Sequence, residues 1–283
     1  MDKIITCIDG SAITQSVTEA GVWAAKKLMK TLTLLHTIEK HHQHGADNYS
    51  GAIGLEAQSK LLDEIAQLDE QKNKLAMQLG NQLLDSMAAT ARGMGIEDIE
   101  KLQRHGDIVE AICTLDKKTR FIVMGRKGSG HEGKFKALGS HIETLLRKAS
   151  HPVLIVPDKF SPPSSFMIAY DGRGSADRAL EKVIEGGLLH GLHCHLVSIK
   201  NGDTAFEERF NIASNRLKEN GFTVTSSLLE GKAHDAIIQY QVENQVNLVM
   251  MGAFGHSMIR QLFVGSTTLK VLEKIDVPLI ILR

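Results

Sequence analysis

The sequence predicts an α/β protein built from two tandem copies of one unit, each a five-stranded, mostly parallel open sheet with helices on both faces. Three observations predict this fold class: an internal repeat, apolar runs that alternate with helical patterns, and a stretch rich in proline and serine between the copies. Strands that are apolar along their whole length are typical of parallel sheets covered by helices on both faces. With 283 residues, 42% of them hydrophobic, the chain is long enough for two domains of ordinary size.

The repeat consists of matching segments that occur in the same order in both halves. Phe121–Gly125 and Leu248–Gly252 are apolar runs that end in Met-Gly, and Asp9 and Asp171 close the first apolar run of each copy. Because several matches keep their order, chance similarity is a poor explanation, and the copies are expected to share one fold.

The two copies differ in length. The first copy is longer by about 35 residues, which fall around 40–75, between its second strand and the following helix. The stretch Pro157–Ser165 reads as a linker because proline and serine cluster there. We therefore expect one domain at 1–157, carrying the insertion, and a second at 166–283.

Each copy alternates strands and helices. Ile4–Asp9 is an apolar run, and Val17, Ala20, Ala24 and Leu28 follow it at helical spacing. The remaining elements of the first copy are strands at Leu32–Ile38, Ile96–Gln103, Phe121–Gly125 and Val153–Val156 and helices at roughly 61–91, 107–118 and Gly139–Ala149. The second copy repeats the order with Phe166–Asp171, Ala176–Leu188, His193–Ile199, Glu207–Asn220, Thr223–Leu229, Ala233–Glu243, Leu248–Gly252, Gly265–Ile275 and Leu279–Leu282.

Composition excludes several classes of protein. Lys plus Arg equals Asp plus Glu at 33 each, so the basic excess that a nucleic-acid footprint needs is missing. Three widely spaced cysteines do not form a disulfide framework and fit a reducing compartment. No stretch approaches the ~20 apolar residues of a membrane span. We expect a cytoplasmic protein that contacts neither membrane nor nucleic acid.

Ligands of open α/β sheets bind outside the carboxyl ends of the strands. Asp9 and Asp171 end the first strands there, and Gly125 and Gly252 end the fourth. The loops after the fourth strands lead into helices, whose free amides and positive dipole end favour phosphate. Glycines let the backbone approach such a ligand closely. Both copies therefore predict a phosphate-binding loop.

Two better-known phosphate patterns overlap the first loop. The segment 128–133 satisfies the dinucleotide spacing G-x-G-x-x-G, and with Lys134 it nearly satisfies the P-loop, except that Phe135 stands where Ser or Thr must reach magnesium. Both patterns belong directly between a strand and its helix, whereas here the helix starts later. Only a wider spacing is shared by the two copies, so the wider spacing is the better guide to function.

That wider pattern resembles a known family. Gly252-x2-Gly255-x9-Gly265-Ser266, with Asp171 ending the first strand, is similar to the ATP-binding pattern of universal stress proteins, and the resemblance covers both copies. It implies a Rossmann-like fold of the adenine-nucleotide alpha-hydrolase type and a stress-response regulator that binds ATP, AMP or ADP, with or without Mg²⁺. It also implies that two units pair through their final strands, here within one chain, and it leaves a homodimer open.

The resemblance assigns the nucleotide contacts residue by residue. Asp171 would contact the adenine–ribose end, and amides between Gly255 and Ser266 would hold the phosphates. The full set of candidates is Asp171, Gly252, Gly255, His256, Gly265, Ser266 and Thr267 in the second copy and Asp9, Gly125, Gly128, Gly139 and Ser140 in the first. The first copy departs from the pattern, because ten residues separate Gly128 from Gly139 and Ser140-x-x-Glu143 forms a capping box. We expect the reliable site in the second copy and a weaker or repurposed one in the first.

Other interpretations stay open. Asp9 and Asp171 could begin turns, because Asp-Gly is a common turn pair. The cluster His36, His41, His42 and His44 could bind zinc or form a solvated polar loop. Apolar residues of the insertion, from Leu61 to Leu83, could pack on the sheet or form a partner surface.

Catalysis has little support in the sequence. Gly139-Ser140-His141 lacks the strand-to-helix turn of a nucleophile elbow, and no pair of carboxylates closes neighbouring strands. No catalytic residue is assigned, and slow ATP hydrolysis is the most that a phosphate-binding loop with a water molecule could support. A binding module for a metal or small metabolite in the diverged first pocket is the alternative function.

Overall fold

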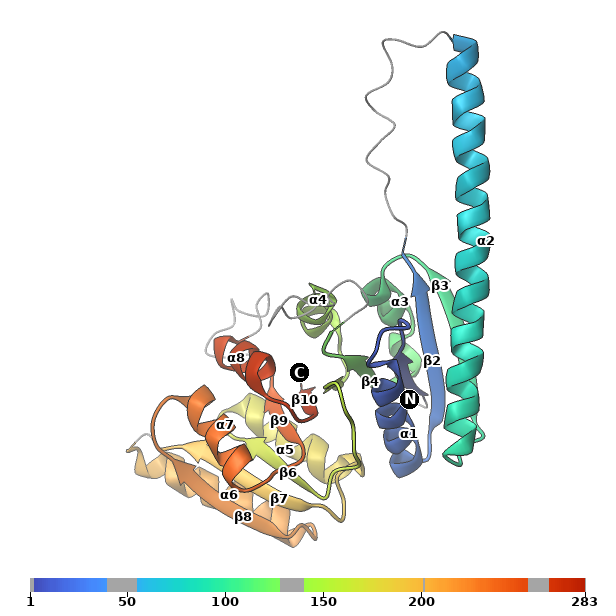
Figure 1. Ribbon diagram of the computed structural model, residues 1–283. Coiled ribbons are helices and arrows are strands. Elements are labelled where there is room, and N and C mark those ends of the chain that lie inside the picture. Colours follow the sequence, from blue (N-terminus) through green and yellow to red (C-terminus); the bar gives the residue numbers. More distant parts are fainter. Residues whose placement is uncertain (1–2, 40–54, 128–139, 201, 254–264, 283) are drawn as a thin grey trace.

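The chain forms one continuous ten-stranded sheet with helices on both faces (Figure 1). The computed structural model describes residues 3–39, 55–127, 140–200, 202–253 and 265–282. The strand order is β3-β2-β1-β4-β5-β10-β9-β6-β7-β8, so each half contributes five neighbouring strands. The expected α/β class, the two five-stranded parallel halves and the helices on both faces are confirmed.

The first half alternates strands and helices as expected. Its elements are β1 (Lys3–Cys7), α1 (Thr14–Leu28), β2 (Thr31–Ile38), α2 (Leu55–Gly93), β3 (Ile99–His105), α3 (Ile108–Thr114), a 3-10 turn (Asp116–Lys118), β4 (Thr119–Gly125), α4 (Ser140–Lys148) and β5 (Val153–Val156). The helix expected at 107–118 is shorter than predicted. Asp107 caps it by accepting hydrogen bonds from the amides of Val109 and Glu110, and the helix ends at Thr114.

The second half repeats this order with smaller connections. Its elements are β6 (Ser165–Ala169), α5 (Gly174–Gly186), β7 (His193–Ile199), α6 (Thr204–Glu219), β8 (Val224–Leu229), α7 (Ala233–Glu243), β9 (Val249–Gly252), α8 (Ser266–Lys274) and β10 (Leu279–Leu282). Helix α6 has 16 residues, whereas its counterpart α2 has 39. Part of the insertion therefore lengthens α2, and residues 40–54 lie outside the described ranges.

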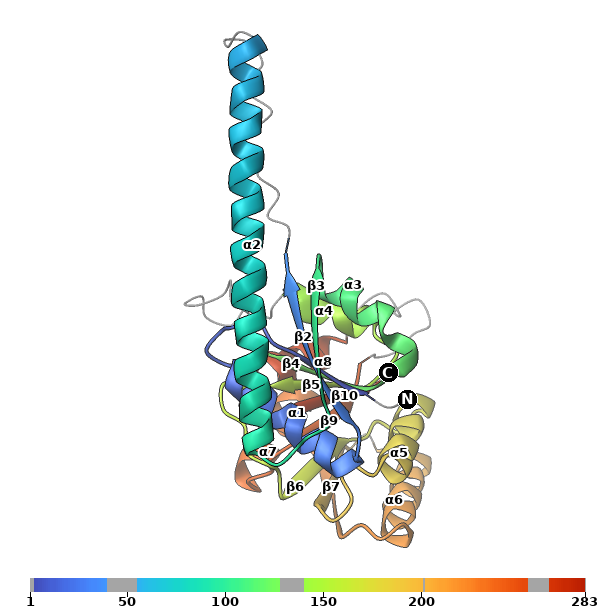
Figure 2. The same ribbon diagram turned by 90° about the vertical axis from the view of Figure 1, so that its right-hand side faces the viewer.

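The sheet separates two hydrophobic clusters. On one face, strand residues such as Ile4, Phe121 and Ile280 pack with α1, α2, α5 and α6. On the other face, residues such as Ile5 and Ile122 pack with α3, α4, α7 and α8. Alternate residues of each strand point to opposite faces, which is why the strands read as continuous apolar runs. In Figure 2, α1 and α2 lie side by side on the first of these faces.

The two halves join through their final strands, as the family resemblance implies. β5 and β10 pair antiparallel, with Leu154 opposite Ile280, whereas β4 and β9 flank them in parallel. Because this junction is antiparallel, the strands of the two halves run in opposite directions. The carboxyl ends of the first-half strands therefore lie at the opposite end of the strands from the carboxyl ends of the second-half strands. Arg126 reaches across the junction, donating to the carbonyl of Ile275 and lying 3.3 Å from a carboxylate oxygen of Asp276.

Helix α2 rises far beyond the sheet (Figure 1). Its last turns pack on the body, where Leu84, Ala88 and Ala91 are buried. Gly80 marks the start of this contact, since a Cβ there would meet the side chains of Gln103 and His36 at 2.5 and 2.6 Å. Within the described ranges, no helix combines the length and apolarity needed to cross a membrane.

Candidate nucleotide site at the strand ends of the second half

Both first strands end in an Asp-Gly turn that only glycine can complete easily. Gly10 and Gly172 adopt left-handed φ values of 77° and 70°. In the second half, Oδ1 of Asp171 accepts from the amide of Arg173 at 3.2 Å. In the first, Oδ1 of Asp9 accepts from the amide of Ser11 at 3.0 Å. Both carboxylates therefore stabilise their turns. This shared contact does not tell which of the two copies binds a ligand.

A cavity of about 410 Å³ opens at the strand ends of the second half. Its described lining includes every candidate of the second copy that the structure describes, namely Asp171, Gly252, Gly265, Ser266 and Thr267. The cavity falls in the ~300–1,000 Å³ range of small-molecule sites. Gly255 and His256 lie outside the described residues.

The wall of this cavity is partly apolar and partly polar. Val197, Leu229 and Ile237 contribute apolar surface from β7, β8 and α7. Tyr170 is 3% exposed, and its hydroxyl donates to Asp177 at 2.6 Å. Burial, and then the hydrogen bond to Asp177, raises the pKa of the Tyr170 phenol well above its ordinary range. This tyrosine therefore stays neutral and holds the start of α5 against the strand end.

The N-terminus of α8 faces the same cavity. Its N-cap residue is Gly265, which makes no side-chain capping hydrogen bond, and no acid lies in the first turn. The Gly265 amide donates to the carbonyl of Ala253 at 3.0 Å, and Oγ1 of Thr268 donates to the carbonyl of Gly252 at 3.0 Å. These two bonds fix the start of α8 at the end of β9. Helix amides without a side-chain cap are suited to an anion.

Sequence reasoning missed some residues of this site. Arg173, Ala176 and Ala179 also line the cavity, from the turn after β6 and from α5. Nη1 of Arg173 lies 3.7 Å from Oδ2 of Asp171. The two alanines carried no signal, because small residues in a helix are common. Only a comparison of α5 with the larger side chains of its counterpart α1 in the first half could have identified these alanines as part of the site.

Beside the fourth strand of the first half, the described side chains pack closely against Gly125. A Cβ on Gly125 would lie 2.3 Å from Cδ1 of Ile13 and 3.2 Å from Cγ2 of Val17. Ile13 is 6% exposed and Val17 is 2% exposed, so both side chains are part of the core. Beside Gly252, by contrast, a Cβ would meet no atom of the described residues within 4 Å. Ile13 and Val17 thus occupy the region that the second half leaves open.

The carboxylate of Asp9 is also more heavily engaged than its counterpart. Besides the Ser11 amide, its Oδ1 accepts from the hydroxyls of Ser11 at 2.6 Å and Thr14 at 3.3 Å. Gly128 and Gly139 lie outside the described residues, and of Ser140 only the backbone is described, as the first residue of α4. The structure thus places Asp9 and Gly125 at the same end of the first-half strands.

The zinc alternative rests on His36 and on three histidines that lie outside the described residues. Among the described residues, no group of three or more His, Cys, Asp or Glu side chains is arranged to hold a metal ion. Nδ1 of His36 lies 3.0 Å from the carbonyl of Ile8, and the other three histidines of its cluster fall outside the described ranges. Burial raises the pKa of the thiols of Cys7 and Cys194 to about 12, so both are poor nucleophiles.

Comparison with solved structures supports the fold. A universal stress protein from Archaeoglobus fulgidus DSM 4304 superposes with a TM-score of 0.70 at 22% identity, covering 100% of this chain and 96% of the other. A universal stress protein from Pseudomonas aeruginosa UCBPP-PA14 gives 0.64 at 17% identity and covers 100% and 93%. The fold is therefore a pair of Rossmann-like α/β domains in one chain.

Comparison of sequences then shows the family. The model of the universal stress protein family matches residues 1–157 and 164–283. The universal stress protein Slr1230 from Synechocystis sp. is 31% identical over 287 residues, covering the whole of both chains. A universal stress protein from Thermus aquaticus is 25% identical over 134 residues, which are 42% of this chain and 98% of that protein. The chain belongs to the universal stress protein family and is of its tandem type.

Proposed function

We propose that this chain binds one adenine nucleotide, ATP or AMP, in the cavity of its second half and acts as a nucleotide-responsive regulator in the stress response. The observation that carries the proposal is the convergence of Asp171, Gly252, Gly265, Ser266 and Thr267 on one cavity of about 410 Å³. These residues come from two segments far apart in the sequence.

The chemistry of the lining suits each part of the nucleotide. The uncapped amides at the start of α8 would receive the phosphates, assisted by the Ser266 hydroxyl. The apolar side chains of Val197, Leu229 and Ile237 would hold the base. Asp171 would accept hydrogen bonds from the ribose hydroxyls. Mg²⁺, when it accompanies ATP, would be held mainly through phosphate oxygens and water.

The two halves would have different roles. Ile13 and Val17 pack closely beside Gly125, whereas the Cβ position at Gly252 has no described atom within 4 Å, and this difference supports a ligand in the second half. We propose that the domain at 1–157 is mainly a structural partner, which closes the final-strand pairing inside one chain. The domain at 166–283 would carry the ligand.

The test is mass spectrometry of nucleotide released from the freshly purified protein, together with calorimetry using ATP and AMP. We expect adenine nucleotide in the released fraction and saturable binding to the stripped protein. A matched pair of variants locates the site: Asp171→Ala should weaken binding, whereas Asp9→Ala should not. Absence of binding at millimolar ATP, or equal loss in both variants, would refute the proposal.

A further inference from the structure

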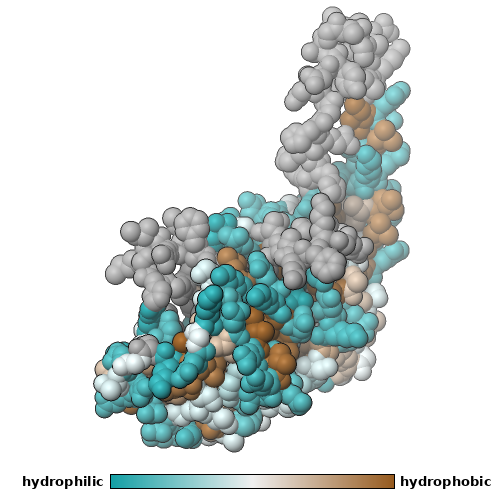
Figure 3. All heavy atoms as spheres, turned by 60° about the vertical axis from the view of Figure 1, so that its left-hand side comes forward, coloured by the Kyte–Doolittle hydropathy of each residue, from teal (hydrophilic) through white to brown (hydrophobic). Residues whose placement is uncertain are grey.

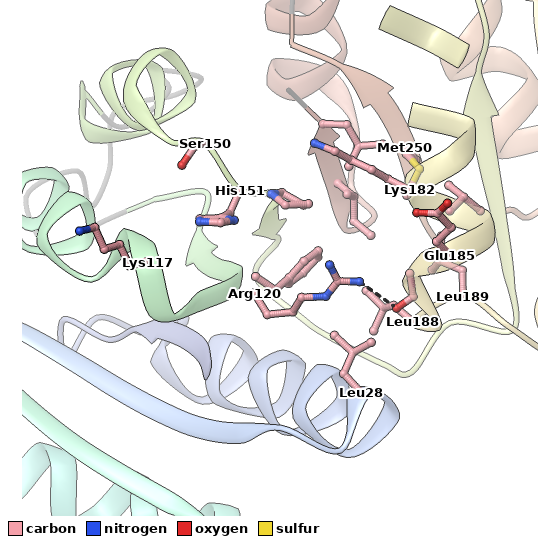
Figure 4. Close-up of a pocket in the computed structure, with 16 residues that line it drawn as sticks. Leu28, Lys117, Arg120, Ser150, His151, Lys182, Glu185, Leu188, Leu189 and Met250 are labelled. Carbon is pink, nitrogen blue, oxygen red and sulfur yellow. Dashed lines mark hydrogen bonds between the residues drawn. The ribbon is translucent and has the colours of Figure 1, made fainter. Parts of the chain in front are cut away.

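A second cavity, of about 660 Å³, lies where the two halves meet (Figure 4). It sits on the sheet face that carries α1 and α5, above the junction of β5 and β10. Apolar side chains from both halves form its floor and sides, among them Leu28, Phe121, Val183, Leu189, Met250 and Ile280. The cavity uses no residue of the first or second nucleotide loop.

The rim of this cavity is cationic. Arg120 enters it from the start of β4 and Lys182 from α5 (Figure 4). Lys117, from the 3-10 turn, and His151 also line it. Glu185 is the one carboxylate in the described lining. Nη2 of Arg120 lies 3.4 Å from the carbonyl of Gly186, near the end of α5. The two halves thus bring positive charge together over an apolar floor.

Like charges at this rim act on one another. Burial, and then the charges of Arg178 and Arg120, lowers the pKa of the Lys182 ammonium. An anion seated between Arg120 and Lys182 would relieve this repulsion and gain charge-assisted hydrogen bonds. A neutral or cationic ligand of the same shape would gain neither.

We propose that this cavity binds a small amphipathic anion, with an alkyl chain on the apolar floor and a carboxylate between Arg120 and Lys182. The chain would lie against Leu28 and Leu189, one from each half. Because both halves contribute to the site, occupancy would stabilise one relative placement of the two halves. The inference does not depend on nucleotide binding, since Met250 is the only residue that the described linings of the two cavities share.

The probe is decanoate, titrated calorimetrically into the full-length protein, with decanol and decyltrimethylammonium as neutral and cationic analogues. We expect about one decanoate per chain, with binding at least tenfold weaker for both analogues because they lack the charge-assisted contact. Decyl phosphate distinguishes a general anion site from a carboxylate site. Decanol binding as tightly as decanoate would overturn the proposal.

Variants assign the site. Lys182→Gln removes the charge and keeps a side chain of similar length, so it should weaken decanoate binding about tenfold, and Leu28→Trp should block the floor. Lys218→Gln removes an exposed lysine that does not line the cavity and should change nothing. Gly252→Val, which fills the nucleotide cavity, should leave decanoate binding intact. Decanoate affinity that is the same in Lys182→Gln and Leu28→Trp as in the parent protein would overturn the assignment.

A different observation, on the projecting part of α2, carries a second inference. This part of the helix has the alternating spacing of three and four residues that forms a coiled-coil seam. The seam positions are Ile65, Leu68, Lys72, Leu75 and Leu79, of which only Lys72 is charged. Leu68 is 55%, Leu75 56% and Leu79 56% exposed. The space-filling view shows hydrophobic patches on this helix, well above the body (Figure 3).

We infer that this seam pairs antiparallel with the same helix of a second copy. Acidic residues, Asp63, Glu64, Asp69 and Glu70, precede the basic pair Lys72 and Lys74 along the helix. Antiparallel pairing places the acidic stretch of one copy beside the basic pair of the other, whereas parallel pairing opposes like charges and stacks Lys72 on Lys72. Antiparallel pairing also places the ten-stranded sheets of the two copies at opposite ends of the paired helices.

Sedimentation equilibrium tests the seam. The parent protein should be a dimer, and Leu68→Glu with Leu75→Glu should be a monomer. Ala66→Glu with Asn73→Glu adds the same charge at exposed positions off the seam and should remain a dimer. Spin labels at position 63 should lie about 20 Å apart along the axis in the antiparallel pair. A monomeric parent protein, a dimer that survives the seam variant, or adjacent labels would overturn the inference.

Discussion

An alanine substitution should destabilise the protein at Gly125 and leave its stability almost unchanged at the equivalent Gly252. At Gly125, a new methyl group would lie 2.3 Å from Cδ1 of Ile13 and 3.0 Å from its Cγ1. Ile13 is only 6% exposed, so its side chain has little room to move. Overpacking of this kind costs ~1–3 kcal/mol. We therefore expect Gly125→Ala to lower the free energy of unfolding by about 2 kcal/mol.

At Gly252 the methyl group would enter open space. Its Cβ position has no neighbour within 4 Å among the residues that the structure describes, and its φ lies outside the left-handed region. Gly252→Ala should therefore change the free energy of unfolding by less than about 0.5 kcal/mol. Gly252→Val fills more of the same space and should weaken ATP binding at least tenfold, whereas Gly125→Ala should leave ATP affinity unchanged.

Urea denaturation followed by circular dichroism measures the first effect, and calorimetric titration with ATP measures the second. The reasoning would be refuted if Gly125→Ala were as stable as the parent protein, since Ile13 would then not fill the region beside Gly125. It would equally be refuted if Gly252→Val bound ATP as tightly as the parent protein.

Three further predictions follow from individual contacts. Thr268→Val removes the hydrogen bond to the carbonyl of Gly252 and leaves a buried acceptor, so the free energy of unfolding should fall by about 1–2 kcal/mol, and ATP affinity should fall with it; denaturation and titration check both. In the folded protein at pH 8, iodoacetamide should modify the exposed Cys113 and spare Cys7 and Cys194, whose pKa of about 12 keeps them as buried thiols; peptide mapping that finds Cys7 modified first would contradict this. Burial and the nearby His193 hold the pKa of His195 below its ordinary 6.5, so the unfolded chain takes up the proton first and stability falls as the pH drops below about 6.5. His195→Gln should flatten the dependence of the denaturation midpoint on pH between pH 7 and 5, and an unchanged slope would exclude His195 as its source.

The sequence predicts much of this fold because its strands are marked by chemistry that does not depend on distant contacts. Apolar runs locate the strands, and Asp171 and Gly252 locate the strand ends of the second half. Parallel pairing then brings those ends to one edge, which is why residues 81 positions apart line one cavity. The pairing of the final strands came from the resemblance to a family and not from the residues themselves.

What the sequence could not predict depends on side-chain packing across elements. Ile13 and Val17 read as ordinary apolar residues of a helix, and only the structure shows that they fill the region beside Gly125. The inter-half cavity arises because antiparallel pairing of β5 and β10 brings Arg120 close to α5, although Arg120 and Lys182 belong to different copies. No periodicity within one copy carries that information.

The central claim is that one chain holds one nucleotide, at the strand ends of its second half. A calorimetric titration of nucleotide-free protein with ATP, analysed for the number of sites, tests it most directly. We expect one ATP per chain in the parent protein, and at least tenfold weaker binding in Gly252→Val. Two ATP molecules per chain, or an ATP affinity of Gly252→Val equal to that of the parent protein, would contradict this claim.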